Sequence, residues 1–207
     1  IVSLDGFRAD YPGRADTPNL DRIAASGVHA EGLIPAFPSK TFPNHYTIVT
    51  GLYPEHHGIV SNYFYDPDFD AQFGMMDDDS NSNGRWWLGE PIWVTAERQG
   101  VTSATCMWTG SEAEIGGYRP SYWVPYGALD YAGRIEQVVD WLGLPDDRRP
   151  QLLTLYFDEP DGVGHATGPE GTEVEHTVET MDGWIGTLLN RLEEEHQLDD
   201  LHIIIVS

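Results

Sequence analysis

The chain is poor in basic residues and in cysteine. Of its 207 residues, 34 are Asp or Glu and 11 are Lys or Arg, so the formal net charge is −23, and Lys40 is the single lysine. A surface this negative argues against binding nucleic acid or anionic lipid through general electrostatics. It does not exclude a small phosphate-bearing ligand, because a bound metal ion can reverse the charge of one pocket. Cys106 has no partner for an internal disulfide, and its place in a predicted strand favours a buried apolar role.

Long apolar runs, a signal peptide and several common catalytic motifs are also missing. No stretch of roughly 18 apolar residues exists, so we expect no membrane segment. No Walker loop, Gly-x-Gly-x-x-Gly fingerprint or Gly-x-Ser-x-Gly elbow is found. The content of 40% hydrophobic and 12% aromatic residues is nevertheless enough for a core, and the length suits one domain or a large part of one. Because both ends lie in apolar runs, we expect a fragment of a longer chain, incomplete at both ends.

Short apolar runs alternate with helical patterns along the chain. We expect buried strands at residues 1–4, 101–107, 152–157 and 202–206. Helices are expected between the N-cap Thr17 and Gly27 and at residues 91–99, 132–142 and 174–195. This alternation predicts an α/β fold with a mainly parallel central sheet flanked by helices. Residues 66–84, rich in Asp, Asn and Ser, are expected to form a surface loop or insertion.

Candidate metal ligands follow a strand, where parallel sheets bind their ligands. Asp161 and His165 lie four residues apart just after the third strand, and a carboxylate and an imidazole at this spacing can ligate one zinc ion. Pro160, Gly162 and Gly164 favour a shaped loop over a helix here. A polar surface loop remains the alternative, because two ligands fall short of a complete zinc site.

Thr41 and Asp5 are the other candidates for chemistry. Thr41 lies at a loop-to-helix junction, near free backbone amides, so its hydroxyl is either a nucleophile toward phosphorus or simply a helix N-cap. Asp5 ends the first strand and is either a metal ligand or a turn residue before Gly6. The adjacent His56 and His57 are expected to be structural or to support ligands, because neighbouring side chains rarely converge on one ion.

Several long motifs occur in a fixed order along nearly the whole chain. The most distinctive are S-L-D-G-F-R-A-D at residues 3–10, F-P-S-K-T-F-P-N-H-Y at 37–46 and L-Y-F-D-E-P-D-G-V-G-H at 155–165. Further matching stretches lie at residues 17–20, 50–59, 89–93 and 108–111. Together they resemble the nucleotide pyrophosphatase/phosphodiesterase family of the alkaline phosphatase superfamily. The resemblance implies an alkaline-phosphatase-like fold, with residues 1–207 as the N-terminal part of one catalytic domain.

The resemblance also implies a two-zinc hydrolase. Asp5 and Thr41 would belong to one Zn²⁺, and Asp161 and His165 to the other. Thr41 would be the nucleophile and form a phosphothreonine intermediate, so nucleotide pyrophosphates and 5′-phosphodiesters would release nucleoside 5′-monophosphates. The family's remaining ligands, in an Asp-His-Gly motif and a later His, would fall beyond residue 207. We therefore expect this piece alone to bind zinc weakly and to have little turnover.

The substrate contacts implied by the resemblance come from polar and aromatic residues. Asn62 would hydrogen-bond a phosphate oxygen, Phe42 and Tyr126 would hold a nucleobase, and Tyr156 would be a neighbouring wall. Trp108, with Glu112, falls where some relatives tune base preference. Related hydrolases of lipid or choline phosphodiesters, phosphonates or phosphomonoesters remain alternatives, as does an inactive binding module. Family members commonly work outside the cytoplasm, as extracellular, periplasmic or membrane-anchored enzymes.

Overall fold

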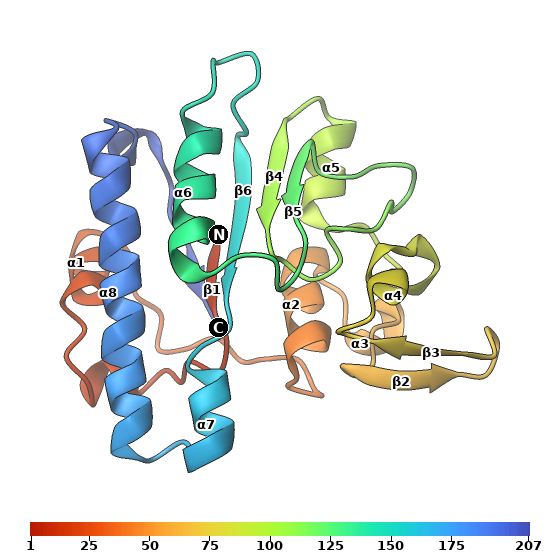
Figure 1. Cartoon of the computed structure of the whole chain (residues 1–207), viewed down its shortest axis with the longest axis horizontal. Helices are drawn as coiled ribbons and strands as arrows, with labels where there is room; N and C mark the ends of the chain where they lie inside the picture. The colour runs from red at the N-terminus through yellow and green to blue at the C-terminus, as the bar shows by residue number, and fades with distance from the viewer. The chain divides into compact units, whose positions relative to one another are not determined.

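The computed structural model describes residues 1–207, which divide into two compact units. Unit 1 comprises residues 1–34, 129–144 and 155–207, and unit 2 comprises residues 35–128 and 145–154. Strand β6 (Leu152–Phe157) contributes residues to both units. The strand order is β5-β4-β6-β1-β7 (Figure 1), and β1 pairs in parallel with β6 and β7 as β4 does with β5. The structure thus confirms an α/β fold with a parallel central sheet flanked by helices.

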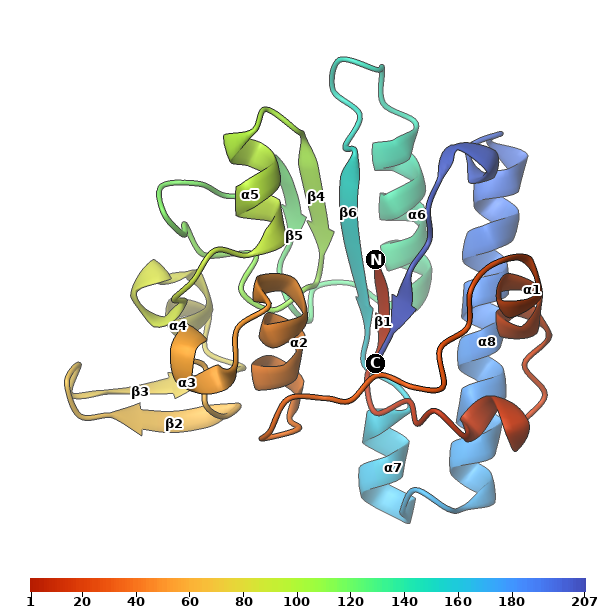
Figure 2. The same cartoon turned by 180° about the vertical axis from the view of Figure 1, so that it is seen from behind.

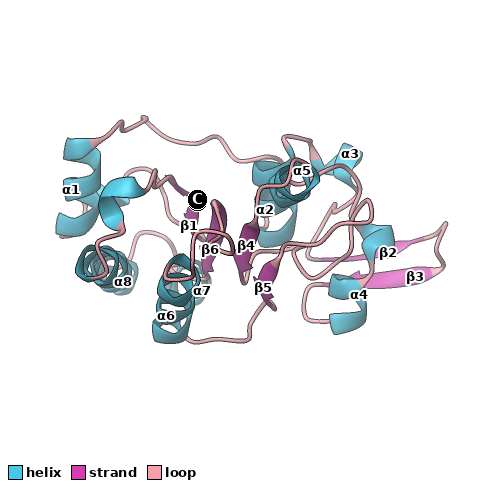
Figure 3. Ribbon diagram, turned by 90° about the horizontal axis from the view of Figure 1, so that it is seen from above, coloured by secondary structure: helices cyan, strands magenta, loops and turns pink.

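Unit 1 combines part of this sheet with four α-helices. Its elements are β1 (Val2–Leu4), α1 (Pro18–Ser26), α6 (Tyr131–Leu142), α7 (Asp161–Thr167), α8 (Thr172–Glu194) and β7 (Ile205–Val206), with short 3-10 helices at Tyr11–Gly13 and Leu198–Asp200. Helices α6 and α8 lie side by side on one face of β1 (Figures 2 and 3), and α1 and α7 also contact α8. The apolar stripe of α8 is buried along its whole length, as its periodicity predicts.

Unit 2 is built around buried aromatic side chains. Its elements are α2 (Thr41–Thr50), α3 (Pro54–His57), β2 (Tyr63–Asp66), β3 (Ala71–Gly74), α4 (Asp78–Ser82), a 3-10 helix at Gly84–Trp86, α5 (Ile92–Arg98), β4 (Ser103–Cys106) and β5 (Tyr122–Val124). Phe42, Tyr46, Phe73 and Trp87 are all buried, and their rings pack mainly edge to face. Cys106 is buried in β4, as predicted.

The four predicted strands and four predicted helices are all present, with small shifts at their ends. The last strand is the largest difference, because only Ile205–Val206 of residues 202–206 is paired. Local periodicity missed the shorter elements α3, β2, β3, α4 and β5. None of the helices combines the length and the apolarity needed to cross a bilayer.

Residues 66–84, predicted to form a surface loop or insertion, contain regular structure. Strand β3 pairs antiparallel with β2, and Phe73 on β3 is 1% exposed. The Asp66 carboxylate accepts hydrogen bonds from two backbone N–H groups of the hairpin turn. Asp77 caps α4 by accepting from the Ser80 N–H at 3.2 Å. The acidic residues of this segment therefore serve in a turn and at a helix cap. These elements were not predicted from the sequence, because the segment has no regular hydrophobic periodicity.

Thr17 occupies the N-cap position of α1 but does not cap the helix with its side chain. Its hydroxyl is buried and has no hydrogen-bond partner. The carboxylate of Asp182 on α8, which is 2% exposed, accepts from the N–H groups of Asn19 at 3.2 Å and Leu20 at 2.8 Å. A carboxylate forms stronger hydrogen bonds to these amides than a hydroxyl does. Asp182 on α8 therefore caps α1 in place of Thr17.

Candidate functional site

The turn after β1 places Asp5 against the start of α7. The backbone N–H of Asp5 donates to Phe157 O at 2.9 Å, and the N–H of Asp161 donates to Asp5 O at 3.1 Å. Gly6 makes this approach possible, because a Cβ at Gly6 would lie 2.7 Å from the Cα of Asp161. Two predicted metal ligands, Asp5 and Asp161, are therefore joined by a backbone hydrogen bond in unit 1.

Asp161 and His165 lie on a helix, which corrects the expectation of a shaped loop. Helix α7 spans Asp161–Thr167, with Pro160 at the N-cap position, where a proline does not break the helix. The carboxylate of Glu159 accepts from the Val163 N–H at 3.0 Å, and Val163 packs against the buried cluster of Tyr11, Val174 and Val178. Tertiary packing thus outweighs the low helix propensity of the two glycines in this segment.

The Asp161–His165 pair has a geometry that fits a zinc ion. The two residues are one helical turn apart, so their side chains share a face, and His165 Nε2 lies 3.4 Å from Asp161 Oδ2. Ligand atoms about 2.0–2.1 Å from a tetrahedral ion are separated by about 3.4 Å. The His165 side chain is 81% exposed, so an ion has open access to this pair. No group of three or more His, Cys, Asp or Glu side chains that could hold a metal is present.

Tyr156 reaches the Asp5 side chain from the neighbouring strand. Its hydroxyl donates to Asp5 Oδ2 at 2.8 Å, and the residue is 3% exposed. The structure therefore gives Tyr156, predicted as a wall of the substrate site, a contact with a predicted metal ligand.

A buried arginine fixes the segment between β6 and α7. Arg134 is 6% exposed and donates to Tyr156 O at 3.0 Å and to Asp158 Oδ1 at 2.7 Å. The Tyr131 hydroxyl donates to the other oxygen of Asp158 at 3.2 Å, and burial raises the pKa of Tyr131. Sequence reasoning overlooked this network. The sequence signal for this network is Arg134, a charged residue that lies four positions before Val138 and so on the apolar face of α6.

In unit 2, Thr41 is the first residue of α2. Lys40 is the N-cap and makes no side-chain cap bond, so the start of this helix is not closed by a local hydroxyl or carboxylate. The Phe42 N–H in the first turn donates to Asn62 Oδ1 at 2.9 Å. This bond identifies the other end of the Asn62 amide, Nδ2, as the donor available to a ligand. The helix dipole and the Asn62 amide both favour an anion here.

The predicted nucleobase pair, Phe42 and Tyr126, is closed in this structure. Phe42 is fully buried, and the two ring centroids are 5.1 Å apart in an edge-to-face contact. A base between two parallel rings needs a separation of about 7 Å, so none fits between these rings as they stand. Tyr126 is partly exposed, and its N–H donates to Glu112 Oε1 at 2.9 Å. Burial raises the pKa of Glu112.

Trp108 makes a hydrogen bond to the backbone of α2. The residue is fully buried, and its indole N–H donates to His45 O at 3.2 Å. It therefore presents no exposed atoms to a substrate, in contrast to its predicted binding role.

The predicted site residues fall into two groups. Asp5, Tyr156, Asp161 and His165 lie in unit 1, whereas Thr41, Phe42, Asn62, Trp108 and Tyr126 lie in unit 2. Within each group, hydrogen bonds or ring contacts join most members.

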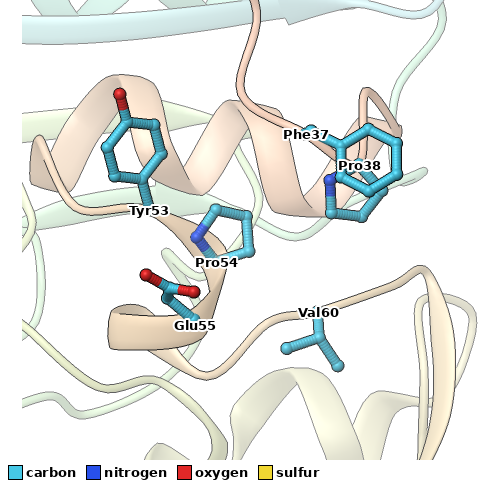
Figure 4. A pocket seen from close by; sticks show the side chains of 6 residues that line it. All are labelled: Phe37, Pro38, Tyr53, Pro54, Glu55 and Val60. Atoms are coloured by element: carbon cyan, nitrogen blue, oxygen red, sulfur yellow. The ribbon is translucent and has the colours of Figure 1, made fainter.

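A hollow of about 360 Å³ lies on unit 2 (Figure 4), and the residues that line it precede and follow α2 in the sequence. Its lining is formed by Phe37, Pro38, Tyr53, Pro54, Glu55 and Val60. None of the predicted site residues lines this hollow.

Comparison with known proteins gives matches over the whole chain. The sequence profile described as type I phosphodiesterase/nucleotide pyrophosphatase matches residues 1–207. An uncharacterized pyrophosphatase/phosphodiesterase of Schizosaccharomyces pombe is 48% identical over 209 residues, which are 100% of this chain and 43% of that protein. Ectonucleotide pyrophosphatase/phosphodiesterase family member 1 of Homo sapiens is 43% identical over 210 residues, which are 100% of this chain and 23% of that protein.

Solved structures agree with these sequence matches. Murine ectonucleotide pyrophosphatase/phosphodiesterase 5, as an inactive threonine-to-alanine variant in complex with AMP, superposes with a TM-score of 0.89 at 34% identity. The match covers 95% of this chain and 52% of that one. The chain thus spans less than half the length of these two curated relatives and about half of this solved structure.

Proposed function

Because the chain belongs to the type I phosphodiesterase/nucleotide pyrophosphatase family, we propose that its protein hydrolyses nucleotide pyrophosphates and 5′-phosphodiesters to nucleoside 5′-monophosphates. The observation that carries the proposal is the start of α2. There, Thr41 stands in the first turn and Asn62 is held by the Phe42 N–H. A hydroxyl and an amide donor at a helix N-terminus suit an attack on a phosphate group.

The proposed metal ligands are Asp161 and His165 for one Zn²⁺, and Asp5 with the Thr41 hydroxyl for another. The 3.4 Å separation of the Asp161 and His165 donor atoms supports the first assignment. Two bound Zn²⁺ ions would neutralise the charge of the phosphodiester and stabilise the attacking and leaving oxygens.

The residues of the chain then have separate roles. The Thr41 hydroxyl gives up its proton to solvent and attacks phosphorus, the bond to the leaving oxygen breaks, that oxygen takes up a proton from solvent, and a phosphothreonine forms. Water cleaves the new P–O bond and releases the nucleoside 5′-monophosphate. Asn62 Nδ2 donates to a non-bridging phosphate oxygen. The base stacks on the partly exposed ring of Tyr126, while buried Phe42 supports that ring at its edge.

The murine neighbour supports this assignment in two respects. Its inactive form carries a threonine-to-alanine change, and it binds AMP, which is a nucleoside 5′-monophosphate. The human relative is named an ectonucleotide enzyme, so we also propose that this protein works outside the cytoplasm, secreted, periplasmic or membrane-anchored. If a protease added to intact cells leaves this protein uncut, a surface-anchored location is contradicted.

Three substrates separate the proposed activity from related ones. The protein, at the full length that its gene encodes, should cleave the p-nitrophenyl ester of thymidine 5′-monophosphate faster than p-nitrophenyl phosphate or a choline phosphodiester. A chelator should abolish the reaction, and added zinc should restore it. Faster cleavage of the monoester or the choline diester, or a rate insensitive to chelator, would contradict the proposal.

Replacing the nucleophile tests the role of Thr41. Thr41→Ala should lower kcat roughly 10³-fold or more, because no other group takes over a lost nucleophile efficiently. Zinc content, measured by atomic absorption, should stay near that of the unchanged protein. Thr50→Ala is the matched control in the same helix, where the hydroxyl donates to Tyr46 O and accepts from the Leu52 N–H, and its kcat should not change. A Thr41→Ala protein that retains most of its kcat would exclude this nucleophile.

A further inference from the structure

The strand register places Tyr156 on the same face of the sheet as Asp5. Ser3 on β1 lies opposite Tyr156 on β6 in a parallel pair. Side chains alternate between faces along a strand, and Asp5 is two residues beyond Ser3, so it continues the face of Ser3 and Tyr156. The long phenol spans this diagonal, and its hydroxyl donates to Asp5 Oδ2 at 2.8 Å.

We propose that Tyr156 is a positioning residue that sets the orientation of the Asp5 carboxylate for metal binding. This inference rests on the proposed function, in which Asp5 is a metal ligand. The phenol engages Oδ2, and Asp5 Oδ1 remains as the oxygen for the metal. With 3% of its surface exposed, Tyr156 has little area for a substrate and acts through Asp5.

The backbone of Asp5 is already fixed, so the phenol removes its remaining freedom. The Asp5 N–H is bonded to Phe157 O at 2.9 Å, and Asp5 O accepts from the Asp161 N–H at 3.1 Å. Only rotation of the side chain is left. A hydrogen bond from a phenol to an ionised carboxylate is charge-assisted and therefore strong enough to select one rotamer.

Tyr156 is itself held rigidly. Arg134 Nη1 donates to Tyr156 O at 3.0 Å, and the same nitrogen donates to Asp158 Oδ1 at 2.7 Å. The support therefore runs from buried Arg134, through the backbone of β6, to the phenol and the carboxylate of Asp5. Groups that hold metal ligands in this way contribute about 10–100-fold to metal affinity.

Zinc affinity is the direct test, measured on the full-length protein by competition with a chromophoric chelator. Tyr156→Phe should raise the zinc dissociation constant about 10–100-fold, because only the hydroxyl is lost. Tyr65→Phe is the matched control. It also removes a phenol-to-carboxylate bond, from Tyr65 to Asp70 at 2.6 Å, but Asp70 is not a predicted ligand. Zinc affinity of this control should equal that of the unchanged protein.

A second background shows whether the phenol acts through Asp5. In an Asp5→Ala protein, adding Tyr156→Phe should weaken zinc binding no further. An equal weakening with and without Asp5 would overturn the inference, and so would a Tyr156→Phe protein with normal zinc affinity and only a raised KM. If the protein without any substitution binds no zinc, that result contradicts the proposed function instead. Circular dichroism of the metal-free variants verifies that each one is folded.

Discussion

His57 illustrates how burial decides the chemistry of a single side chain. The residue is fully buried, and its Nδ1 accepts from the Ile59 N–H at 3.2 Å. The proton of the neutral ring therefore lies on Nε2, which donates to Thr47 Oγ1 at 3.0 Å. Burial lowers the pKa of His57 to about 4. The side chain is a neutral structural group, consistent with the expectation for the His56–His57 pair.

This low pKa predicts a loss of stability in mild acid. In the unfolded chain the pKa of His57 is 6.5, so as pH falls the unfolded state takes up the proton first. The contribution to stability is complete above pH 6.5 and is lost as pH falls toward 4, up to about 3 kcal/mol. Between pH 7 and 4.5, His57→Gln should therefore lose less free energy of unfolding in urea than the unchanged protein. Exposed His56→Gln is the control and should lose as much as the unchanged protein. Identical pH slopes for His57→Gln and the unchanged protein would rule this out.

At the scale of elements, the turn between β1 and the first 3-10 helix determines how close α7 can lie. Gly6 has φ +68°, in the left-handed region, and its hydrogen faces the backbone of Asp161. Sequence alone supplied the motif Asp5-Gly6 but not the partner of the glycine. Asp161 is 155 positions further along the chain, so no local pattern could identify the contact.

Gly6→Ala should therefore destabilise the fold more than an alanine substitution at a glycine with the same φ angle. Gly51 also has φ +68°, but no atom lies within 4 Å of a Cβ built there. Gly51→Ala should cost only the backbone strain, about 1–2 kcal/mol. Gly6→Ala adds a clash with Asp161 Cα, so it should cost more in urea unfolding and should also weaken zinc binding. Equal losses of stability, with zinc binding unchanged, would show that the contact is not needed.

At the scale of the whole molecule, charge is the dominant property. With 34 acidic and 11 basic residues, at least 23 carboxylates have no basic residue of their own to neutralise them. The ion pairs that do form lie mostly at the surface, for example Arg14 with Glu175 and Arg191 with Glu136. Surface pairs contribute little, so the net repulsion of the carboxylates remains.

Salt should therefore stabilise this chain. Raising NaCl from 0.1 to 1 M shortens the Debye length from about 10 to about 3 Å and screens the repulsion. The free energy of unfolding in urea should rise and solubility should be retained, which is the behaviour of an acidic protein adapted to high salt. Chloride is preferable to sulfate, because sulfate stabilises proteins generally by exclusion from their surface. Precipitation in 1 M NaCl, or lower stability there, would argue against this adaptation.

The sequence by itself determined four of the five strands of the central sheet, the long helices and the order of the family motifs. Periodicity is local, so β6 at residues 152–157 and the apolar stripe of α8 could be predicted without a partner. The candidates Asp5, Thr41, Asp161 and His165 were likewise apparent from residue type, spacing and resemblance. These features depend on residues a few positions apart.

The tertiary structure alone decided the partners of these residues. It made residues 161–167 a helix despite two glycines, and it gave the cap of α1 to Asp182 instead of Thr17. It also buried Phe42 against Tyr126 and joined Tyr156 to Asp5. Each of these contacts links residues that are far apart in the sequence, except the helix, which packing on α8 stabilises. Their free energies come from burial and directed hydrogen bonds, which a local pattern does not encode.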